Sequence, residues 1–374
     1  MAKTSQLDAI ARVAPVLRGL LAEPAGDDDQ PFRPVILKSL AGGKKSRRAL
    51  RLDPPKAGEG DEELRSRLTA SLQNYGTKHK AGPEIISLPD VGAFQVVKPK
   101  AAAGFDPRLV GRTALVTGAA GAIGYGICRG LLERGCHVAI TDLPGEKLDS
   151  FVAEFQKRDA ARVVGVAMDV TDPASVARGF AEVGATWGGV DIVVVNAGLA
   201  LVSPLVEIDL EAFRRLERVN VEGTLLVLAE AGRHFARQKT GGDVVLISTK
   251  NVFSPGAGFG AYSATKAAAH QLARIASLEF APLGVRVNMV SPDAVFSGGA
   301  HKSGLWAEVG PGRMKARGLD EKGLEEYYRN RNLLKARVTA EHVANAVLFF
   351  ATRQTPTTGA CIPVDGGLPD ATPR

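Results

Sequence analysis

Tyr262 and Lys266 stand four residues apart in the segment AYSATKAAAHQLA and can together do acid–base chemistry. On a helix this spacing places both side chains on one face, with about 6 Å between their Cβ atoms. A phenol has a pKa of about 10 and is a poor acid–base catalyst at neutral pH unless a cation stabilises its phenolate. A lysine one turn away supplies that cation, so the pair predicts proton transfer with an alcohol or carbonyl. An ordinary helix with an exposed Tyr and Lys shows the same spacing. The residues upstream of the pair therefore decide between a catalytic pair and an ordinary helix.

The elements upstream form a pattern typical of a dinucleotide site. An apolar run ending at Val116 leads into Gly118, Gly121 and Gly124, then a helical stretch, and then a second apolar run that ends at Asp142. Strand, glycine turn, helix, strand and acid is the context that a dinucleotide fingerprint requires. Glycines let the backbone approach a pyrophosphate, and the helix start offers unpaired N–H groups.

Asp142 indicates which dinucleotide to expect. Its carboxylate can accept hydrogen bonds from the adenosine ribose hydroxyls and would repel a 2′-phosphate. No Arg or Lys stands at Ala119, Ala120 or Leu143 to bind that phosphate. We therefore expect NAD rather than NADP.

With these segments, the chain resembles the short-chain dehydrogenase/reductase family from Gly111 to Gly367. The resemblance implies a Rossmann-type fold, hydride transfer and a catalytic set of Asn220, Thr249, Tyr262 and Lys266, in which Asn220 holds a water behind the lysine. It also implies a set of residues that hold the cofactor: Gly118, Gly121, Ile123, Gly124, Asp142, Asp169, Val170, Asn196, Gly198, Tyr262, Lys266, Pro292 and Val295.

Three residues depart from the family pattern. The middle glycine comes one place early, at Gly121, a spacing that also occurs in epimerase-type members. The position of the family's serine, thirteen residues before the tyrosine, holds Thr249, whose hydroxyl can still donate; Ser248 beside it is the alternative. Asp293 stands where the family has a glycine, which puts an acid near the nicotinamide pocket.

A narrower resemblance concerns the substrate. The segments STKN and SPDAVFSG, and the stretch from LEEYY to FFA, are similar to the dehydrogenase half of bifunctional rhamnulose-phosphate aldolase/lactaldehyde dehydrogenase proteins. The aldolase half is absent, because the first 110 residues hold a single histidine, His79, which cannot supply a multi-histidine metal site. We therefore expect no metal and a small hydroxy-aldehyde, sugar or polyol substrate.

The organisation of the chain follows from its alternating patterns. Residues 111–369 alternate strands and helices as in successive βαβ units, which predicts an α/β fold with a doubly wound parallel sheet. Residues 293–338 are too long for a plain connection and predict a substrate lid with nine basic side chains. Residues 1–110 predict a partly ordered N-terminal extension of unknown role, with helices at 6–21 and 61–73, an apolar segment that breaks at Pro15, and one short strand after the second helix.

Composition limits the partners. The net charge is +7, and the densest run of basic side chains is Lys44, Lys45, Arg47, Arg48 and Arg51. Without interleaved aromatic residues this run does not favour nucleic-acid binding. No apolar run is long enough to span a membrane, no secretory leader is recognisable, and three cysteines in apolar surroundings predict a reduced, cytoplasmic protein. The family resemblance implies a homodimer or tetramer. Two other functions stay open: an epimerase or dehydratase that uses NAD transiently, and a non-catalytic cofactor-binding interaction protein.

Overall fold

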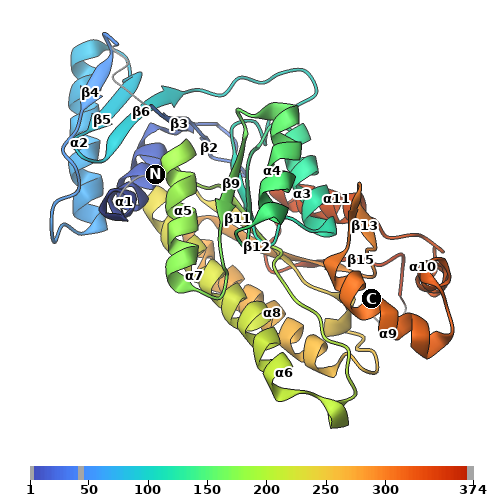
Figure 1. Ribbon diagram of the computed structural model, residues 1–374. Helices are drawn as coiled ribbons and strands as arrows, with labels where there is room; N and C mark the ends of the chain where they lie inside the picture. The colour runs from blue at the N-terminus through green and yellow to red at the C-terminus, as the bar shows by residue number, and fades with distance from the viewer. Residues whose placement is uncertain (1–3, 41–45, 369–374) are drawn as a thin grey trace.

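The computed structural model describes residues 4–40 and 46–368. A seven-stranded sheet with helices on both faces forms the main body, and a smaller N-terminal unit lies against one side of it (Figure 1). All neighbouring strands of the large sheet are parallel, in the order β15-β12-β11-β10-β7-β8-β9. The strands are β7 (Thr113–Val116), β8 (His137–Asp142), β9 (Val163–Ala167), β10 (Ile192–Val195), β11 (Gly242–Ile247), β12 (Val285–Pro292) and β15 (Cys361–Val364). The doubly wound sheet expected from the sequence is confirmed.

Both faces of this sheet are buried, which explains why its strands read as unbroken apolar runs. In β7, Ala114 and Val116 point into one core and Leu115 into the other. Helices α3 (Ala122–Glu133), α4 (Glu146–Asp159) and α11 (Ala340–Ala351) cover the first face. Helices α5 (Pro173–Trp187), α7 (Gly223–Gln238) and α8 (Gly260–Glu279) cover the second.

The carboxyl ends of the strands lead into the segments that surround the site. After β10 come η1 (Leu205–Glu207), α6 (Leu210–Glu217) and the π-helical turn η2 (Arg218–Glu222), which continues into α7. The turn η3 (Lys250–Val252) follows β11, and η4 (Ala281–Leu283) precedes β12. Beyond β12 the chain forms the β13–β14 ribbon (Ser297–Gly298 with His301–Lys302) and the helices α9 (Gly304–Arg317) and α10 (Glu321–Asn330).

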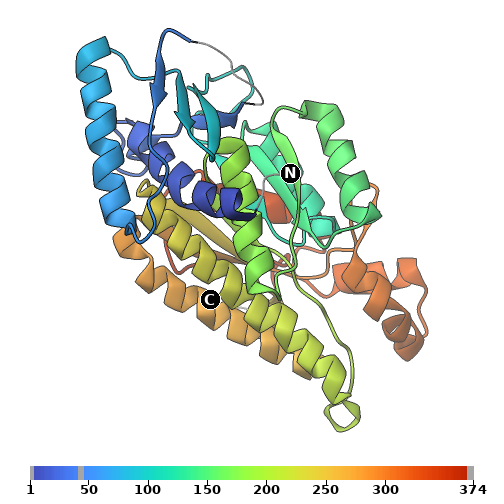
Figure 2. The same cartoon turned by 60° about the vertical axis from the view of Figure 1, so that its left-hand side comes forward.

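The N-terminal unit has its own sheet and core. Its elements are α1 (Thr4–Leu21), β1 (Glu23–Pro24), β2 (Phe32–Arg33), β3 (Ile36–Ser39), β4 (Ala49–Arg51), α2 (Asp61–His79), β5 (Ile85–Leu88) and β6 (Gly92–Val97). The sheet has the order β3-β6-β5-β4, and Leu37, Leu64, Leu68, Ile86 and Phe94 are buried together. Figure 2 shows α1 lying across α5 and α7 of the main body, which it contacts.

Several expectations for this unit need correction. The first helix, expected at 6–21, is confirmed as α1, and the apolar segment expected to break at Pro15 continues through it inside that helix. The second helix continues past residue 73 to His79. The single strand expected after α2 is a hairpin, β5–β6, whose turn holds Asp90 at a φ of 60°. Of the basic run, Arg48 forms an ion pair with Glu84, while Lys44 and Lys45 lie outside the described residues.

Three negative or neutral findings bear on partners. No helix in the described part of the chain is both long and apolar enough to cross a membrane. Within residues 4–40 and 46–368, no cluster of three or more His, Cys, Asp or Glu side chains could hold a metal ion. Cys128 and Cys136 are buried, Cys361 is half-buried, and all three thiols are unpaired.

Candidate active site

The glycine turn between β7 and α3 is shaped by close backbone contacts. Gly118 has a φ of 56°, and a Cβ there would lie 2.6 Å from the Cα of Ala197. A Cβ on Gly124 would lie 2.2 Å from the carbonyl oxygen of Ala119, so the first turn of α3 needs glycine to lie against this loop. At Gly121, which precedes α3, a Cβ would meet nothing closer than 3.9 Å. The turn therefore leaves open space in front of the free N–H groups at the start of α3.

Two acids stand beside this turn at the ends of β8 and β9. The carboxylate of Asp142 accepts hydrogen bonds from the backbone N–H of Ala120 at 2.9 Å and of Leu143 at 2.8 Å. Asp169 accepts from the backbone and the hydroxyl of Thr171 at 2.9 and 2.8 Å. These bonds fix both carboxylates at the rim of one cavity, which Val170 also lines.

The end of β10 is tied to the glycine turn by Asn196. Its side-chain amide donates to the carbonyls of Thr117 at 3.0 Å and Gly118 at 2.8 Å. Two residues further on, a Cβ at Gly198 would lie 3.4 Å from Nζ of Lys266. Gly198 therefore lies in contact distance of the lysine, next to the side-chain oxygen of Asn220.

Asn220 lies in the π-helical turn η2 and is buried. Its side-chain oxygen accepts from the N–H of Leu199 at 2.9 Å, and its amide donates to the carbonyl of Leu199 and to Oγ1 of Thr265, both at 3.0 Å. The amide thus joins the segment after Gly198 to helix α8. All other predicted catalytic and cofactor residues line the cavity, whereas Asn220 stands behind it.

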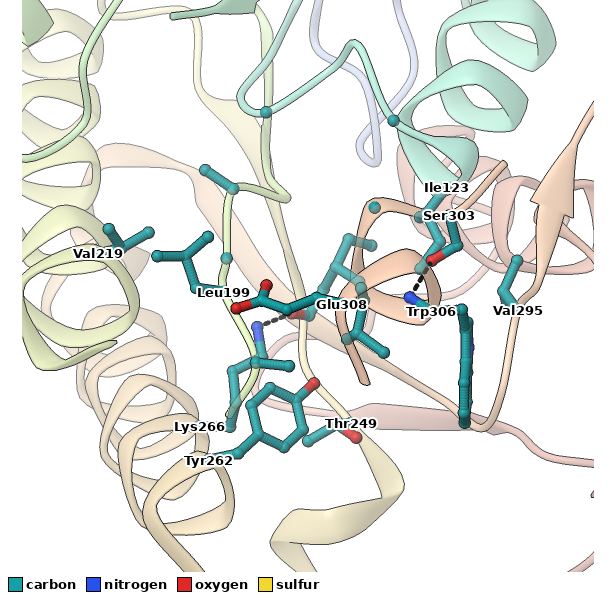
Figure 3. A pocket seen from close by; sticks show the side chains of 18 of the residues that line it. Ile123, Leu199, Val219, Thr249, Tyr262, Lys266, Val295, Ser303, Trp306 and Glu308 are labelled. Carbon is teal, nitrogen blue, oxygen red and sulfur yellow. Dashed lines mark hydrogen bonds between the residues drawn. The ribbon is translucent and has the colours of Figure 1, made fainter. Parts of the chain in front are cut away.

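Tyr262 and Lys266 project from the first turns of α8 into the cavity. Figure 3 shows the phenol of Tyr262 pointing into the open space with Thr249 beside it. Nζ of Lys266 donates to the carbonyl of Ile247 at 2.8 Å, at the end of β11. Helix α8 is therefore held against β11, the strand that precedes Thr249. The side chains of Thr249, Tyr262 and Lys266 line the same part of the cavity.

Burial controls the charge state of both groups. It raises the pKa of Tyr262 to about 12, and a hydrogen bond with Thr249 opposes that rise. Burial also lowers the pKa of Lys266 to about 8. The sequence led us to expect that the lysine stabilises the phenolate. Loss of solvation outweighs that effect, and the ammonium of Lys266 is directed to the carbonyl of Ile247.

The two candidates for holding the substrate oxygen, Ser248 and Thr249, both line the cavity but have different hydrogen-bond partners. The hydroxyl of Ser248 is within 3.0 Å of Nδ1 of His270, a buried pairing away from Tyr262. The hydroxyl of Thr249 lies beside the phenol and accepts from the backbone N–H of Asn251 at 3.3 Å. Thr249 is thus free to donate its own proton toward the cavity, and His270 has a structural partner.

We predict that Thr249→Val lowers kcat/KM by about 10²-fold, the scale observed when one donor to a reacting oxygen is lost. Ser248→Ala should change kcat/KM by less than fivefold, because its partner His270 lies outside the cavity. Steady-state kinetics of both variants check this. A larger loss in Ser248→Ala than in Thr249→Val would reverse the assignment.

Strand β12 ends with Pro292, which therefore lies within the strand rather than after it. Val295 is buried, and Figure 3 places it on the same side of the cavity as Ile123. The unexpected acid, Asp293, accepts a hydrogen bond from Arg331, which follows helix α10. Its charge is therefore balanced by a residue nearly forty positions further along the chain.

The segment 293–338 forms one wall of the cavity. Of its nine Lys and Arg side chains, Arg313, Arg317 and Arg331 line the cavity, whereas Lys302, Lys315, Lys322, Arg329, Lys335 and Arg337 do not, and neither does His301. Trp306, Tyr327 and Tyr328 line it as well. Glu308 also lines the cavity, as do Arg214, Arg215 and Arg218 at the α6 end. These four residues were not expected from the sequence, because no local pattern indicates which face of a helix meets the cavity.

A family model described as short chain dehydrogenase matches residues 112–308. This chain belongs to the short-chain dehydrogenase family. The match begins just before β7, so the N-terminal unit lies outside the part that defines the family. Members of the family use nicotinamide cofactors, which agrees with the glycine turn and its acids.

Individual oxidoreductases and solved structures are also similar to this chain. It is 38% identical over 265 residues to the uncharacterized oxidoreductase YuxG of Bacillus subtilis, covering 70% of this chain and 38% of that protein. It is 36% identical over 201 residues to sorbitol dehydrogenase of Cereibacter sphaeroides, covering 54% and 76%. The solved structure of sorbitol-6-phosphate 2-dehydrogenase SrlD from Erwinia amylovora matches with a TM-score of 0.63 and 28% identity, over 68% of this chain and 98% of that one.

Proposed function

We propose that this protein is an NAD-dependent dehydrogenase acting on a hydroxyl or carbonyl group of a small polyol, sugar or hydroxy-aldehyde. The observation that carries the proposal is the position of Tyr262 and Thr249, together, in the cavity that the glycine turn and Asp142 also line. The similarity to a sorbitol dehydrogenase supports a polyol, and the narrower resemblance to the lactaldehyde dehydrogenase half of bifunctional proteins adds a hydroxy-aldehyde.

The residues at the glycine turn fit a dinucleotide. The open space at Gly121 leaves room for a pyrophosphate at the start of α3, Asp142 offers acceptors to ribose hydroxyls, and Ile123 and Val295 offer apolar contacts. Bound NAD would supply the hydride acceptor. Lys266 would hold the nicotinamide ribose, and its charge would then favour the ionised form of Tyr262.

The protein's own part in the reaction is to move a proton and orient the substrate. Thr249 donates a hydrogen bond to the substrate oxygen, and Tyr262 takes the hydroxyl proton as the carbon–hydrogen bond breaks. Asn220 fixes α8 against the segment after Gly198 and so sets the distance between Lys266 and the cavity. In the reverse direction Tyr262 returns the proton to the carbonyl oxygen.

The test measures absorbance at 340 nm with sorbitol, xylitol, threitol or lactaldehyde and either NAD or NADP. We expect steady NADH formation and little NADPH formation. Asp142→Asn removes the charge and keeps the shape, so we expect the ratio of kcat/KM for NAD over NADP to fall by about 10- to 100-fold, the scale of a hydrogen bond to a charged group. Equal use of both cofactors by the unaltered protein would contradict the NAD assignment, and binding of NAD without net turnover would favour an epimerase, dehydratase or interaction role.

We also propose a cytoplasmic homodimer or tetramer. Unpaired cysteines support a reducing compartment. Leu225 on α7 and Ile275 and Leu278 on α8 are exposed apolar side chains on neighbouring helices, which favours a partner subunit there. A monomer mass by light scattering at micromolar concentration would contradict this assembly.

A further inference from the structure

Resting on the proposed function, we propose that the substrate carries an anionic group, a phosphate or a carboxylate, and that Arg313 and Lys250 bind it at the end away from the reacting carbon. The ligand is thus an anionic polyol, sugar or hydroxy-aldehyde rather than a neutral one. The two cations come from different segments, the lid helix α9 and the turn η3.

The location of Arg313 places it at the substrate end of the cavity. Its guanidinium lies 4.2 Å from the centre of the Phe259 ring, and that ring is 6.0 Å from the ring of Tyr262. A Cβ on Gly256 would lie 4.0 Å from Nη2 of Arg313. Gly256 and Phe259 belong to the loop that joins Thr249 to Tyr262. The nucleotide end, at Gly121 and Asp142, is built from other strands.

Arg313 is a half-buried cation that forms no ion pair with any carboxylate of residues 4–40 and 46–368. Its Nε is buried without a hydrogen-bond partner in the described part of the chain. Burial lowers the pKa of Arg313, and the neighbouring Arg317 and Arg331 lower it further, against the opposing effect of Tyr328 and Tyr327. A site that gathers positive charge out of water without a counter-ion is stabilised when an anion enters it.

Lys250 adds a second cation next to the reacting centre. It follows Thr249 directly, lines the same cavity and is half-buried. Its ammonium donates to the carbonyl of Ser254 at 3.0 Å, which leaves further N–H groups for a ligand. Burial lowers the pKa of Lys250, and the charges of Arg331 and Arg313 lower it further, against the opposing effect of Asp293 and Asp365. Lys250, Arg313 and Arg331 thus lie within electrostatic reach of one another.

The acids that line the cavity do not cancel this charge. Asp293 forms an ion pair with Arg331, and Glu211 forms one with Arg214 on α6. Asp142 and Asp169 lie at the nucleotide end, held by backbone N–H groups. Glu308 is exposed, and among the described residues its carboxylate forms no ion pair with any Lys or Arg. Arg313 and Lys250 therefore stay available.

The surrounding aromatic rings fix the geometry for such recognition. The guanidinium of Arg331 lies 4.2 Å from the ring of Tyr328, and Tyr328 contacts Trp306 edge to face at 4.9 Å. Stacked guanidinium groups keep their N–H groups in a fixed plane, which suits a phosphate or carboxylate better than a single hydroxyl. Arg313 stacked on Phe259 has the same arrangement.

The experiment compares D-sorbitol 6-phosphate, D-gluconate and D-sorbitol as substrates with NAD. We expect kcat/KM to be at least about 30-fold higher for one of the anionic compounds than for sorbitol, since a charge-assisted contact of this kind gives about tenfold or more. The phosphate and carboxylate arms decide which anion fits. Arg313→Gln and Lys250→Gln should each remove about tenfold of this preference by raising KM for the anionic compound.

Lys315→Gln is the matched control, because Lys315 lies two residues from Arg313 on the same helix but is exposed and outside the cavity. It should leave the preference intact. Oxidation of sorbitol at the same rate as the two anions would overturn this inference and leave the proposed function standing.

Binding is measured separately by calorimetry on the NAD-loaded protein, so that absence of turnover still gives an answer. Tight binding of an anionic compound that Arg313→Gln weakens, without any NADH, would support the anion site and contradict the proposed activity. Equal affinity for sorbitol and both anions would overturn the anion site.

Discussion

Tyr262→Phe is expected to lower kcat by about 10³-fold, within the range that a positioned acid–base group contributes. The substitution removes one oxygen atom from a side chain that is buried against Phe259 and lies beside Thr249. Phenylalanine keeps the ring contacts, so the loss reports proton transfer rather than packing. Steady-state kinetics with NAD and the best substrate of the panel give the measurement, and NAD affinity by calorimetry should change by less than threefold.

The control is Tyr75→Phe, which also removes a buried phenol oxygen. Tyr75 lies on α2 of the N-terminal unit, away from the cavity, and its hydroxyl has no hydrogen-bond partner within the described residues. Its kcat should stay within twofold of the unaltered protein. If Tyr262→Phe kept a tenth or more of kcat while binding NAD normally, another group would carry the proton and the catalytic assignment would be wrong.

The main body was predictable because its signals are local. The central parallel strands, such as β7 and β10, are short runs of apolar, often β-branched residues buried on both faces, and helices lie between most successive strands. The carboxyl ends of these strands meet at one edge, so the motif residues that follow them were expected to lie together. The cavity indeed gathers Gly118, Asp142, Asp169, Asn196 and Thr249.

The N-terminal unit was less predictable because its order comes from distant contacts. Strand β3 pairs with β6, from Ile36 opposite Val97 to Ser39 opposite Phe94, and no local pattern encodes such a pairing. Helix α1 continues through Pro15 although proline lacks a donor, because Val13, Ala14, Val16 and Leu17 are all buried in the core. Tertiary packing here outweighs local propensity.

Within the site, sequence spacing found the residues but not their partners. Counting back from Tyr262 located Thr249, yet the choice over Ser248 depends on His270, which reaches Ser248 from α8. The sequence offered no partner for Asp293, because Arg331, with which it forms an ion pair, lies far along the chain. The pKa values of Tyr262 and Lys266 depend on burial, which a spacing rule does not contain.

Arg18→Met is expected to lower the free energy of unfolding by about 3–5 kcal/mol, the cost of leaving a buried partner charge unpaired. Arg18 on α1 is 1% exposed and donates to Asp191 at 2.6 Å, and also to the carbonyls of Val35 and Gly111. Methionine fills much of the same volume but leaves the Asp191 carboxylate without its cation. Urea unfolding followed by circular dichroism measures the change as a shift in midpoint at constant slope.

The control is Arg12→Met on the same helix. Arg12 pairs with Asp61 near the surface, where 30% of the Arg12 side chain and 44% of the Asp61 side chain are exposed. This substitution should lower the free energy of unfolding by only about 0–1 kcal/mol. Equal effects of the two variants would mean that the N-terminal unit docks without using its buried pair. The larger effect is expected because Asp191 also accepts from the N–H of Thr113 at 2.7 Å and from Gln238 at 3.1 Å. Asp191 precedes β10 and Thr113 begins β7, so the loss of Arg18 reaches the two strands that end at Asn196 and Gly118 in the cofactor cavity.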